Sequence, residues 1–273
     1  MLIEILKSVV LGVVEGITEW LPISSTGHMI LLNKFMGTDS GFFNSQLFLY
    51  VIQLGAILAI ATIYFNKLNP LSPKKTKKEK ADTWQMWFKV IMACIPAAVF
   101  GLLLNDFMDS ISTPLMVASM LIIYGIAFLF AEKKNTRTKI TDMNALSYKT
   151  ALLIGLFQVL SIIPGTSRSG ATILGGILLG TSRSLAAEFS FFLAIPIMFG
   201  VSLLKIVTNT YAMTQNEWIL LIVAMVVAYV VSMLSVKFLV KYVREHDFKV
   251  FGIYRIVLGI IVILSVVFNF LPM

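Results

Sequence analysis

Six long apolar stretches constrain this chain more than any other feature of its sequence. Each holds roughly 18 or more residues with few charges, enough for a helix to cross a hydrocarbon core of about 30 Å. They run approximately over 47–66, 84–104, 114–131, 186–206, 217–240 and 250–271. Of the 273 residues, 58% are hydrophobic and only 13% are charged, which excludes a water-soluble globular protein. The sequence predicts an all-α polytopic membrane protein, with 1–273 as a single membrane domain.

The charges between these stretches predict the orientation of the chain. The linkers 67–83, 132–149 and 237–249 are rich in lysine and arginine, whereas 105–113 and 207–216 contain neither. Basic loops remain on the cytoplasmic side of a membrane. The net charge of +8 is therefore concentrated at one face, next to anionic lipid, and it does not indicate a nucleic-acid partner.

Two further regions, 1–33 and 147–180, are apolar but broken by proline, glycine and polar residues. Loop charges require 147–180 to enter and leave on one side, since 186–206 supplies the crossing. Each arm, about 17 residues long, spans only about 25 Å as a helix. Pro164 and Gly165 mark a turn, so a re-entrant hairpin is predicted. A similar hairpin over 1–33 puts both chain termini outside, whereas a single crossing there would put the N-terminus in the cytoplasm.

A sequence similarity between the two halves of the chain favours the two hairpins. The segments GVVE and PISSTG, beginning at Gly12 and Pro22, resemble GLFQ and PGTSRSG, beginning at Gly155 and Pro164. Each half would then hold one hairpin and three crossings, and because three is odd the halves have opposite orientations. The predicted fold is six transmembrane helices plus two re-entrant helical hairpins in an inverted-topology repeat, comprising 1–131 and 147–271. Such repeats build sites near the membrane midplane.

The pentapeptide GTSRS occurs twice, at 165–169 and at 180–184, and only the first copy lies at a predicted hairpin tip. An arginine within the membrane is costly unless it faces protein, water or an anion, so Arg168 is a functional candidate. The backbone N–H groups and side chains that open the following helix suit an anion. The candidate phosphate-binding residues are Arg168, Ser167, Ser169, Gly165 and Thr172, together with Ser24 and Thr26 of the first hairpin.

The second copy of the pentapeptide has a structural interpretation. About 22 Å of helix separates it from the first copy, which returns it to the membrane surface. Thr181 or Ser182 is expected to cap the next helix, and Arg183 to lie among lipid headgroups.

The first hairpin supplies complementary chemistry. Glu15 and Glu19 are four residues apart on one helix face, where they repel unless a metal, a cation or a proton lies between them. They are therefore candidate metal ligands. A hydroxyl, a nearby base and an orienting acid are the groups needed for attack on phosphorus. The candidate catalytic residues are Ser25, His28, Glu19 and Glu15. A purely structural alternative is a carboxylate pair that only forms a salt bridge with Arg168.

The segments GVVEGITEWLPISSTGH and PGTSRSGATI resemble the two signature motifs of the bacterial undecaprenyl-pyrophosphate phosphatases of the bacitracin-resistance family. The resemblance covers essentially the whole chain, and neither motif departs from the family pattern. It implies removal of the terminal phosphate from a polyprenyl pyrophosphate in the bacterial cell membrane, with a divalent cation, Mg or Ca. It places the family's acids on Glu15 and Glu19, its serine pair on Ser24 and Ser25, and its histidine on His28.

Our mechanistic hypothesis follows from both interpretations. Ser25 attacks phosphorus, His28 takes or relays its proton, and Glu19 orients that histidine or binds the metal. Direct attack by water, with His28 as the base, stays open. The competing function is a transporter or flippase of an anionic or lipid-phosphate substrate, because secondary carriers share the inverted-repeat architecture. The sequence does not fix the oligomeric state, and a homodimer is among the expected assemblies.

Overall fold

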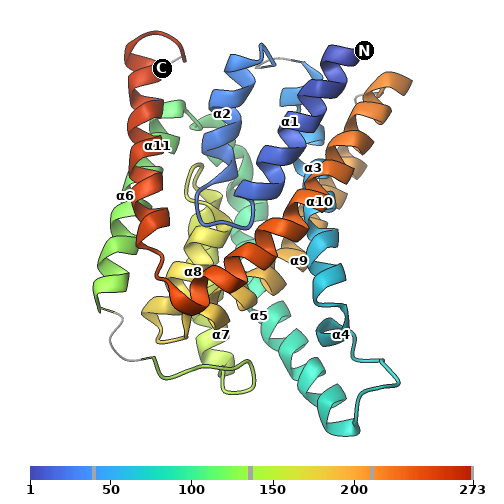
Figure 1. The fold of residues 1–273 in the computed structure, drawn as a ribbon, viewed down its shortest axis with the longest axis vertical. Coiled ribbons are helices and arrows are strands. Elements are labelled where there is room, and N and C mark those ends of the chain that lie inside the picture. The colour runs from blue at the N-terminus through green and yellow to red at the C-terminus, as the bar shows by residue number, and fades with distance from the viewer. Residues whose placement is uncertain (39–40, 135–137, 210–211, 272–273) are drawn as a thin grey trace.

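The computed structural model describes residues 1–38, 41–134, 138–209 and 212–271, and the regular elements in these ranges are all helical (Figure 1). The backbone of Ile140 pairs with that of Thr181 in an isolated bridge, and no β-strand forms within the described ranges. The elements are α1 (Leu2–Thr18), α2 (Ser25–Phe35), η1 (Phe42–Asn44), α3 (Gln46–Ile63), α4 (Phe65–Leu68), α5 (Lys77–Ser110), α6 (Pro114–Lys134), α7 (Tyr148–Val159), η2 (Leu160–Ile162), α8 (Arg168–Leu178), α9 (Arg183–Thr208), α10 (Gln215–Glu245) and α11 (Lys249–Val267).

The six predicted apolar stretches are confirmed as helices that are long and apolar enough to cross a membrane, namely α3, α5, α6, α9, α10 and α11. Their bounds differ from the predicted ones where polar residues continue a helix. Helix α5 begins at Lys77, several residues before the apolar run, because the Thr76 hydroxyl accepts a hydrogen bond from the backbone of Glu79 and caps it. Side chains of Asn105, Asp106 and Asp109 lie outside the described part of this helix.

The two broken regions each form a pair of shorter helices, α1 with α2 and α7 with α8. Helix α1 runs from the N-terminus into the middle of the molecule, where the chain turns, and α2 returns towards the same end (Figure 1). The predicted turn at Pro164 and Gly165 is confirmed, because η2 ends at Ile162 and α8 begins at Arg168. Gly165 supplies a positive φ of 90° there, which only glycine adopts without strain.

Each short helix pair packs against a long helix from the other half of the chain. Helix α1 packs against α10, and α10 against α3; likewise α7 packs against α5, and α5 against α9. Helices α3 and α9 contact each other, as do α6 and α11. The halves of the chain are thus interleaved rather than side by side.

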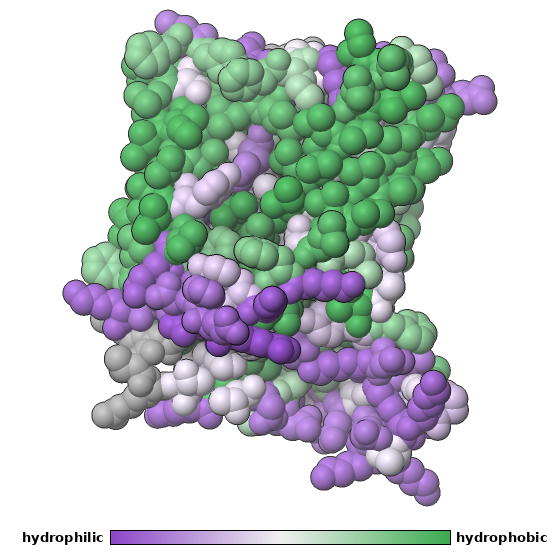
Figure 2. All heavy atoms as spheres, in the orientation of Figure 1, coloured by the Kyte–Doolittle hydropathy of each residue, from purple (hydrophilic) through white to green (hydrophobic). Residues whose placement is uncertain are grey.

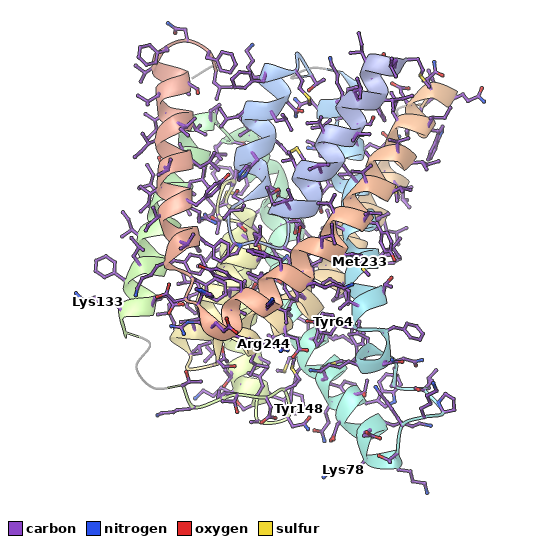
Figure 3. The ribbon with its side chains drawn as sticks, in the orientation of Figure 1. Tyr64, Lys78, Lys133, Tyr148, Met233 and Arg244 are labelled. Carbon is purple, nitrogen blue, oxygen red and sulfur yellow. The ribbon has the colours of Figure 1, made fainter. Side chains whose placement is uncertain are left out.

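Hydrophobic side chains form a broad band around the visible face, and hydrophilic ones gather below it at the end that holds α4 and the start of α5 (Figure 2). Lys78 and Lys133 lie at or near this end (Figure 3). The N-terminus and the C-terminal end of α11 both lie at the opposite end, on different sides of the molecule (Figure 1). This separation of an apolar band from a basic end is the pattern of a multi-pass membrane protein.

Close backbone approach explains why glycines lie on these contact faces. A β-carbon at Gly155 of α7 would meet the backbone carbonyl of Ala93 on α5, and one at Gly12 of α1 would lie 2.6 Å from the carbonyl oxygen of Ala224 on α10. Small residues let helix backbones pack closely within a membrane. Close backbone packing at a glycine therefore holds each short helix pair against a long helix.

We expect Gly155→Ala to destabilise the protein by about 1–3 kcal/mol, because α7 must move away from α5. Gly200→Ala is the matched control, since nothing lies within 4 Å of a β-carbon at Gly200 and alanine favours a helix. Thermal unfolding in detergent measures both variants. Equal unfolding temperatures would contradict this account of the contact.

Candidate functional site

The two turns meet inside the molecule and have the same local geometry. Ser24 and Ser167 precede α2 and α8 with positive φ values of 72° and 71°, which a residue with a side chain adopts only under strain. The hydroxyl of each serine accepts a hydrogen bond from the backbone N–H of the glycine three residues later, Gly27 or Gly170. Matching strain and matching caps therefore present the first residues of both helices, Ser25 and Arg168, in equivalent positions.

The Ser169 hydroxyl joins the second helix pair to the first turn. It lies 3.0 Å from the carbonyl oxygen of Glu19 and 3.3 Å from that of Leu21, and the side chain is buried. A role in contacting phosphate stays a prediction for Ser169, whose hydroxyl already donates to protein here.

Arg255 of α11, which the sequence analysis missed, ties both turns together. It is fully buried, and its guanidinium donates to the carbonyl oxygens of Pro22 at 3.2 Å, Gly165 at 3.0 Å and Thr166 at 2.9 Å. It also lies over the ring of Tyr124, 5.5 Å from the centroid. Because Arg255 lies in a predicted span, the cost argument used for Arg168 could have identified it.

Glu19 lies between the candidate nucleophile and the candidate phosphate-binding cation. Its Oε1 is 2.9 Å from Nη2 of Arg168, and its Oε2 accepts a hydrogen bond of 3.2 Å from the hydroxyl of Ser25. Both members of the ion pair are only 10% exposed at their side chains, so water screens this contact weakly. An acid, a hydroxyl and a guanidinium from two different turns thus converge at one place.

His28 makes other contacts than the mechanistic hypothesis expected. Its Nδ1 lies 2.8 Å from the carbonyl oxygen of Ser24, and its Nε2 lies 2.7 Å from the hydroxyl of Tyr254, whose ring stacks on the imidazole. The expectation that Glu19 orients this histidine does not match the structure, because the carboxylate oxygens of Glu19 contact Ser25 and Arg168. Tyr254 was not identified from sequence, since a tyrosine in an apolar span gives no distinct signal.

The guanidinium of Arg168 is held from its other side by α9. Its Nη1 donates to the carbonyl oxygen of Ser190 at 2.7 Å, and the Ser190 hydroxyl lies 2.7 Å from that of Thr172. Thr172 and Ser190 are buried, and Thr172 also donates to the carbonyl of Arg168. Together they fix where the guanidinium points.

The other predicted site residues differ in how exposed they are at the protein surface. Thr26 is exposed, whereas Ser25, Ser167 and His28 are half-buried and Ser24 and Gly165 are buried. A run of less hydrophobic side chains interrupts the hydrophobic band over the position of α2 (Figure 2). The tip of the first helix pair is therefore the accessible part of the site.

Several buried polar atoms beside this site have no partner in the described structure. They include Oε1 of Glu15, Nε of Arg168, the hydroxyl of Thr166 and both side-chain polar atoms of Gln158. Leaving such atoms unpaired costs about 1–3 kcal/mol each. An orphaned carboxylate oxygen on Glu15, within electrostatic reach of Glu19 and Arg168, fits a hard cation. No cluster of three or more His, Cys, Asp or Glu suited to a metal occurs among the described residues.

The second GTSRS copy has a structural role, as predicted. Ser182 caps α9 by accepting a hydrogen bond from the backbone of Leu185. Arg183 does not lie free among headgroups, because it forms an ion pair of 2.6 Å with the buried carboxylate of Glu132. Glu132 was the unrecognised partner.

We expect Arg255→Lys to loosen both turns, because one ammonium cannot reach the carbonyl oxygens of Pro22, Gly165 and Thr166 together. Hydrogen exchange should become faster in peptides over 19–27 and 163–170 alike. Arg183→Lys, which keeps a charge beside Glu132, is the control and should leave both turns unchanged. Faster exchange in only one turn would contradict the conclusion that Arg255 holds both turns.

Comparison with known proteins agrees with these motifs. The family model described as "Bacitracin resistance protein BacA" matches residues 8–261. A protein of Streptococcus thermophilus named undecaprenyl-diphosphatase is 58% identical over 268 residues, covering 96% of this chain and 93% of that protein. Proteins named undecaprenyl-diphosphatase from Enterococcus faecalis and undecaprenyl-diphosphatase 1 from Clostridioides difficile are 52% and 53% identical, and each alignment covers 96% of this chain and 97% and 96% of those proteins. The chain therefore belongs to the bacitracin resistance protein BacA family.

Proposed function

We propose that this protein is an integral membrane phosphatase that hydrolyses undecaprenyl pyrophosphate to undecaprenyl phosphate and inorganic phosphate, recycling the lipid carrier for cell-wall synthesis. The observation that carries the proposal is the position of Glu19, which contacts both the Ser25 hydroxyl and Arg168. Relatives more than 50% identical over nearly the whole chain carry the name undecaprenyl-diphosphatase, which supports the same substrate.

The chemical step we assign to Ser25 is nucleophilic attack. Its oxygen forms a bond to the terminal phosphorus while the bond from that phosphorus to the bridging oxygen breaks, and undecaprenyl phosphate leaves. The hydroxyl proton passes to Oε2 of Glu19, its hydrogen-bond partner at 3.2 Å. A water molecule then cleaves the phosphoserine, giving inorganic phosphate and restoring the serine.

Arg168 is assigned to the pyrophosphate charge. In the substrate-free protein its guanidinium is balanced by Glu19 and oriented by Ser190. An incoming phosphate competes for the same donors, which frees Glu19 to accept the serine proton. Ser167 and Thr26, the more accessible hydroxyls, are proposed phosphate contacts, while Ser24, Gly165, Ser169 and Thr172 hold the shape of the site.

His28 is assigned to the second step, in which it would take a proton from the water that cleaves the phosphoserine, with Tyr254 as its hydrogen-bond partner. The 2.7 Å contact between Nε2 and the tyrosine hydroxyl gives the imidazole a path to a second proton carrier. The contact of Nδ1 with the Ser24 carbonyl fixes the ring orientation.

Glu15 and Glu19 are the residues we propose to hold a divalent cation, Mg or Ca, together with substrate oxygens; Glu19 would use Oε1, which incoming phosphate frees from Arg168, and keep Oε2 for the serine proton. When bound, such a cation would neutralise phosphate charge and polarise the bond to phosphorus. The orphaned oxygen of Glu15 is the feature of this chain that favours it.

We further propose that α1–α2 and α7–α8 are re-entrant hairpins of an inverted repeat. We match α1 to α7, α3 to α9, α5 to α10 and α6 to α11. This exchange of halves maps the contact of α1 with α10 onto that of α7 with α5, and the contact of α3 with α10 onto that of α9 with α5, whereas the contact of α8 with α9 has no equally extensive match between α2 and α3. Equivalent strained serines at 24 and 167, and equivalent glycine contacts at 12 and 155, support the same pairing.

The orientation we propose follows from the basic end of the molecule. Positively charged loops stay in the cytoplasm. The protein would therefore lie in the bacterial inner membrane with both termini on its outer side. The α1–α2 pair would then admit substrate from the outer face, and α7–α8 would approach from the cytoplasm. A homodimer stays a prediction from the sequence.

Ser25→Ala is expected to lower phosphate release from undecaprenyl pyrophosphate by at least about a thousandfold, because the attacking oxygen is lost. Arg168→Lys should lower it by about a hundredfold, since a point charge lacks the guanidinium fork. Ser119→Ala, at an exposed serine on α6, and Arg183→Lys are the matched controls.

The measurement is phosphate release by purified protein in detergent, with a rapid quench to trap phosphoserine. Full activity in Ser25→Ala would exclude covalent attack by this serine. No release by folded wild-type protein with Mg or Ca would exclude the phosphatase itself.

Chelation by EDTA is expected to abolish phosphate release, and added Mg or Ca to restore it, because phosphate charge is otherwise unbalanced. Glu15→Gln should require a higher cation concentration for half-maximal rate, since a neutral amide binds a hard cation more weakly. Gln158 occupies the position of α7 that matches Glu15 of α1. Gln158→Glu is therefore the reciprocal variant, because it adds a carboxylate where Glu15→Gln removes one. An unchanged cation requirement in Glu15→Gln would exclude Glu15 as a ligand.

A further inference from the structure

A cavity of about 530 Å³ lies at the basic end of the molecule, where the end of α3, the start of α9 and the last turns of α10 meet. None of the residues assigned to the two turns lines it. Tyr64 and Arg244, both on its wall, lie at a similar level of the molecule (Figure 3). The cavity is therefore distinct from the proposed phosphatase site.

Three basic side chains of α10 line this cavity. Lys237, Lys241 and Arg244 are spaced four and three residues apart, which puts them on one helix face. No ion pair with a carboxylate is formed by any of the three among the residues that the structure describes. The one acid on the wall, Glu188, is already paired with Lys67 at 2.7 Å. The cavity therefore carries a surplus of positive charge.

Hydroxyl groups and apolar side chains complete the wall. Ser184, Thr141 and Tyr64 contribute hydroxyls, and Leu185 and Val240 are among the apolar residues. Cations, hydroxyl donors and an apolar floor together suit the phosphate of a lipid better than a fully hydrated ion.

An apolar groove, separate from the cavity, lies farther along the contact between α3 and α10. It measures about 270 Å³ and is lined by Gly55, Leu58, Ile222, Met225, Val226 and Tyr229. Leu58 and Tyr229 lie five and seven residues from Ile63 and Val236 of the cavity wall, about 8 and 11 Å along their helices. The Tyr229 hydroxyl donates to that of Thr62 between the two sites. The groove and the basic cavity therefore lie along the same two helices, with the hydrogen bond between Tyr229 and Thr62 separating them.

We propose that this cavity and groove bind a lipid phosphate monoester with a single hydrocarbon chain, the phosphate among Lys237, Lys241 and Arg244 and the chain along the groove. A phosphate monoester carries up to two negative charges, which the unpaired bases of α10 balance. A single groove accommodates one chain, which favours a prenyl-type or lysolipid phosphate over a phospholipid with two chains. The inference does not depend on the phosphatase activity, because it involves no turnover.

Binding of radiolabelled farnesyl monophosphate to the purified full-length protein in detergent tests the proposal. Arg168→Ala protein serves as the parent, so that binding at the two turns does not obscure the second site. Changing Lys237, Lys241 and Arg244 to Gln should weaken binding at least about tenfold. Changing Lys74, Lys77 and Lys78 to Gln removes equal charge at exposed positions of the same end, outside the cavity, and should leave binding unchanged.

A second pair of variants tests the groove. Leu58→Trp fills the end of the groove nearest the cavity and should weaken farnesyl monophosphate binding several-fold, whereas Val230→Trp, exposed on α10 outside the groove, should not. Photocrosslinking of wild-type protein with a diazirine-bearing farnesyl phosphate should label peptides of α3 and α10, independently of the Arg168→Ala parent.

Three outcomes would overturn the proposal. Equal weakening by both charge variants would show only a general surface attraction. Displacement of the probe by inorganic phosphate at the same concentration as by farnesyl phosphate would remove the role of the chain. Stronger competition by dioleoyl phosphatidic acid than by lysophosphatidic acid would remove the single-chain assignment.

Discussion

The ion pair between Glu19 and Arg168 is the interaction on which the rest of the site depends. A carboxylate and a guanidinium buried apart would each cost several kcal/mol, whereas together they compensate one another across two turns. Arg255 has no carboxylate partner among the described residues and is held by backbone carbonyl oxygens and a tyrosine ring instead. The interior therefore holds two arginines by different means, Arg168 by a carboxylate and Arg255 by backbone carbonyl oxygens.

Much of the fold was predictable because the length of each apolar stretch and the charge of the loops between them are strong, independent indicators. Six apolar stretches gave six helices, and proline followed by glycine gave the turn before Arg168. Helix ends were less predictable, since caps such as that of Thr76 extend α5 into polar sequence. Periodicity alone does not reveal a single hydrogen bond of this kind.

The membership of the site was predictable, but its contacts were not. Unusual polar residues inside apolar sequence identified Glu19, Ser25, His28 and Arg168 as candidates, and the structure brings Glu19, Ser25 and Arg168 together. The mechanistic hypothesis had Glu19 either orient His28 or bind the metal, whereas in the structure its carboxylate contacts Ser25 and Arg168. Tyr254 and Arg255 come from the far end of the chain, and no local pattern connects them with residues 20–28.

The interleaved packing of α1 with α10 has a consequence for biosynthesis. Helix α1 ends at Thr18 and its main partner begins at Gln215, so almost 200 residues must be made before the two can meet. At a translation rate of roughly 5–20 residues per second, synthesis of these residues takes about 10–40 s. Glu19 has no ion-pair partner until Arg168 has been made, about 150 residues after α1, and α1 waits longer still for α10. Assembly of this protein is therefore a late event, completed only when the last helices enter the membrane.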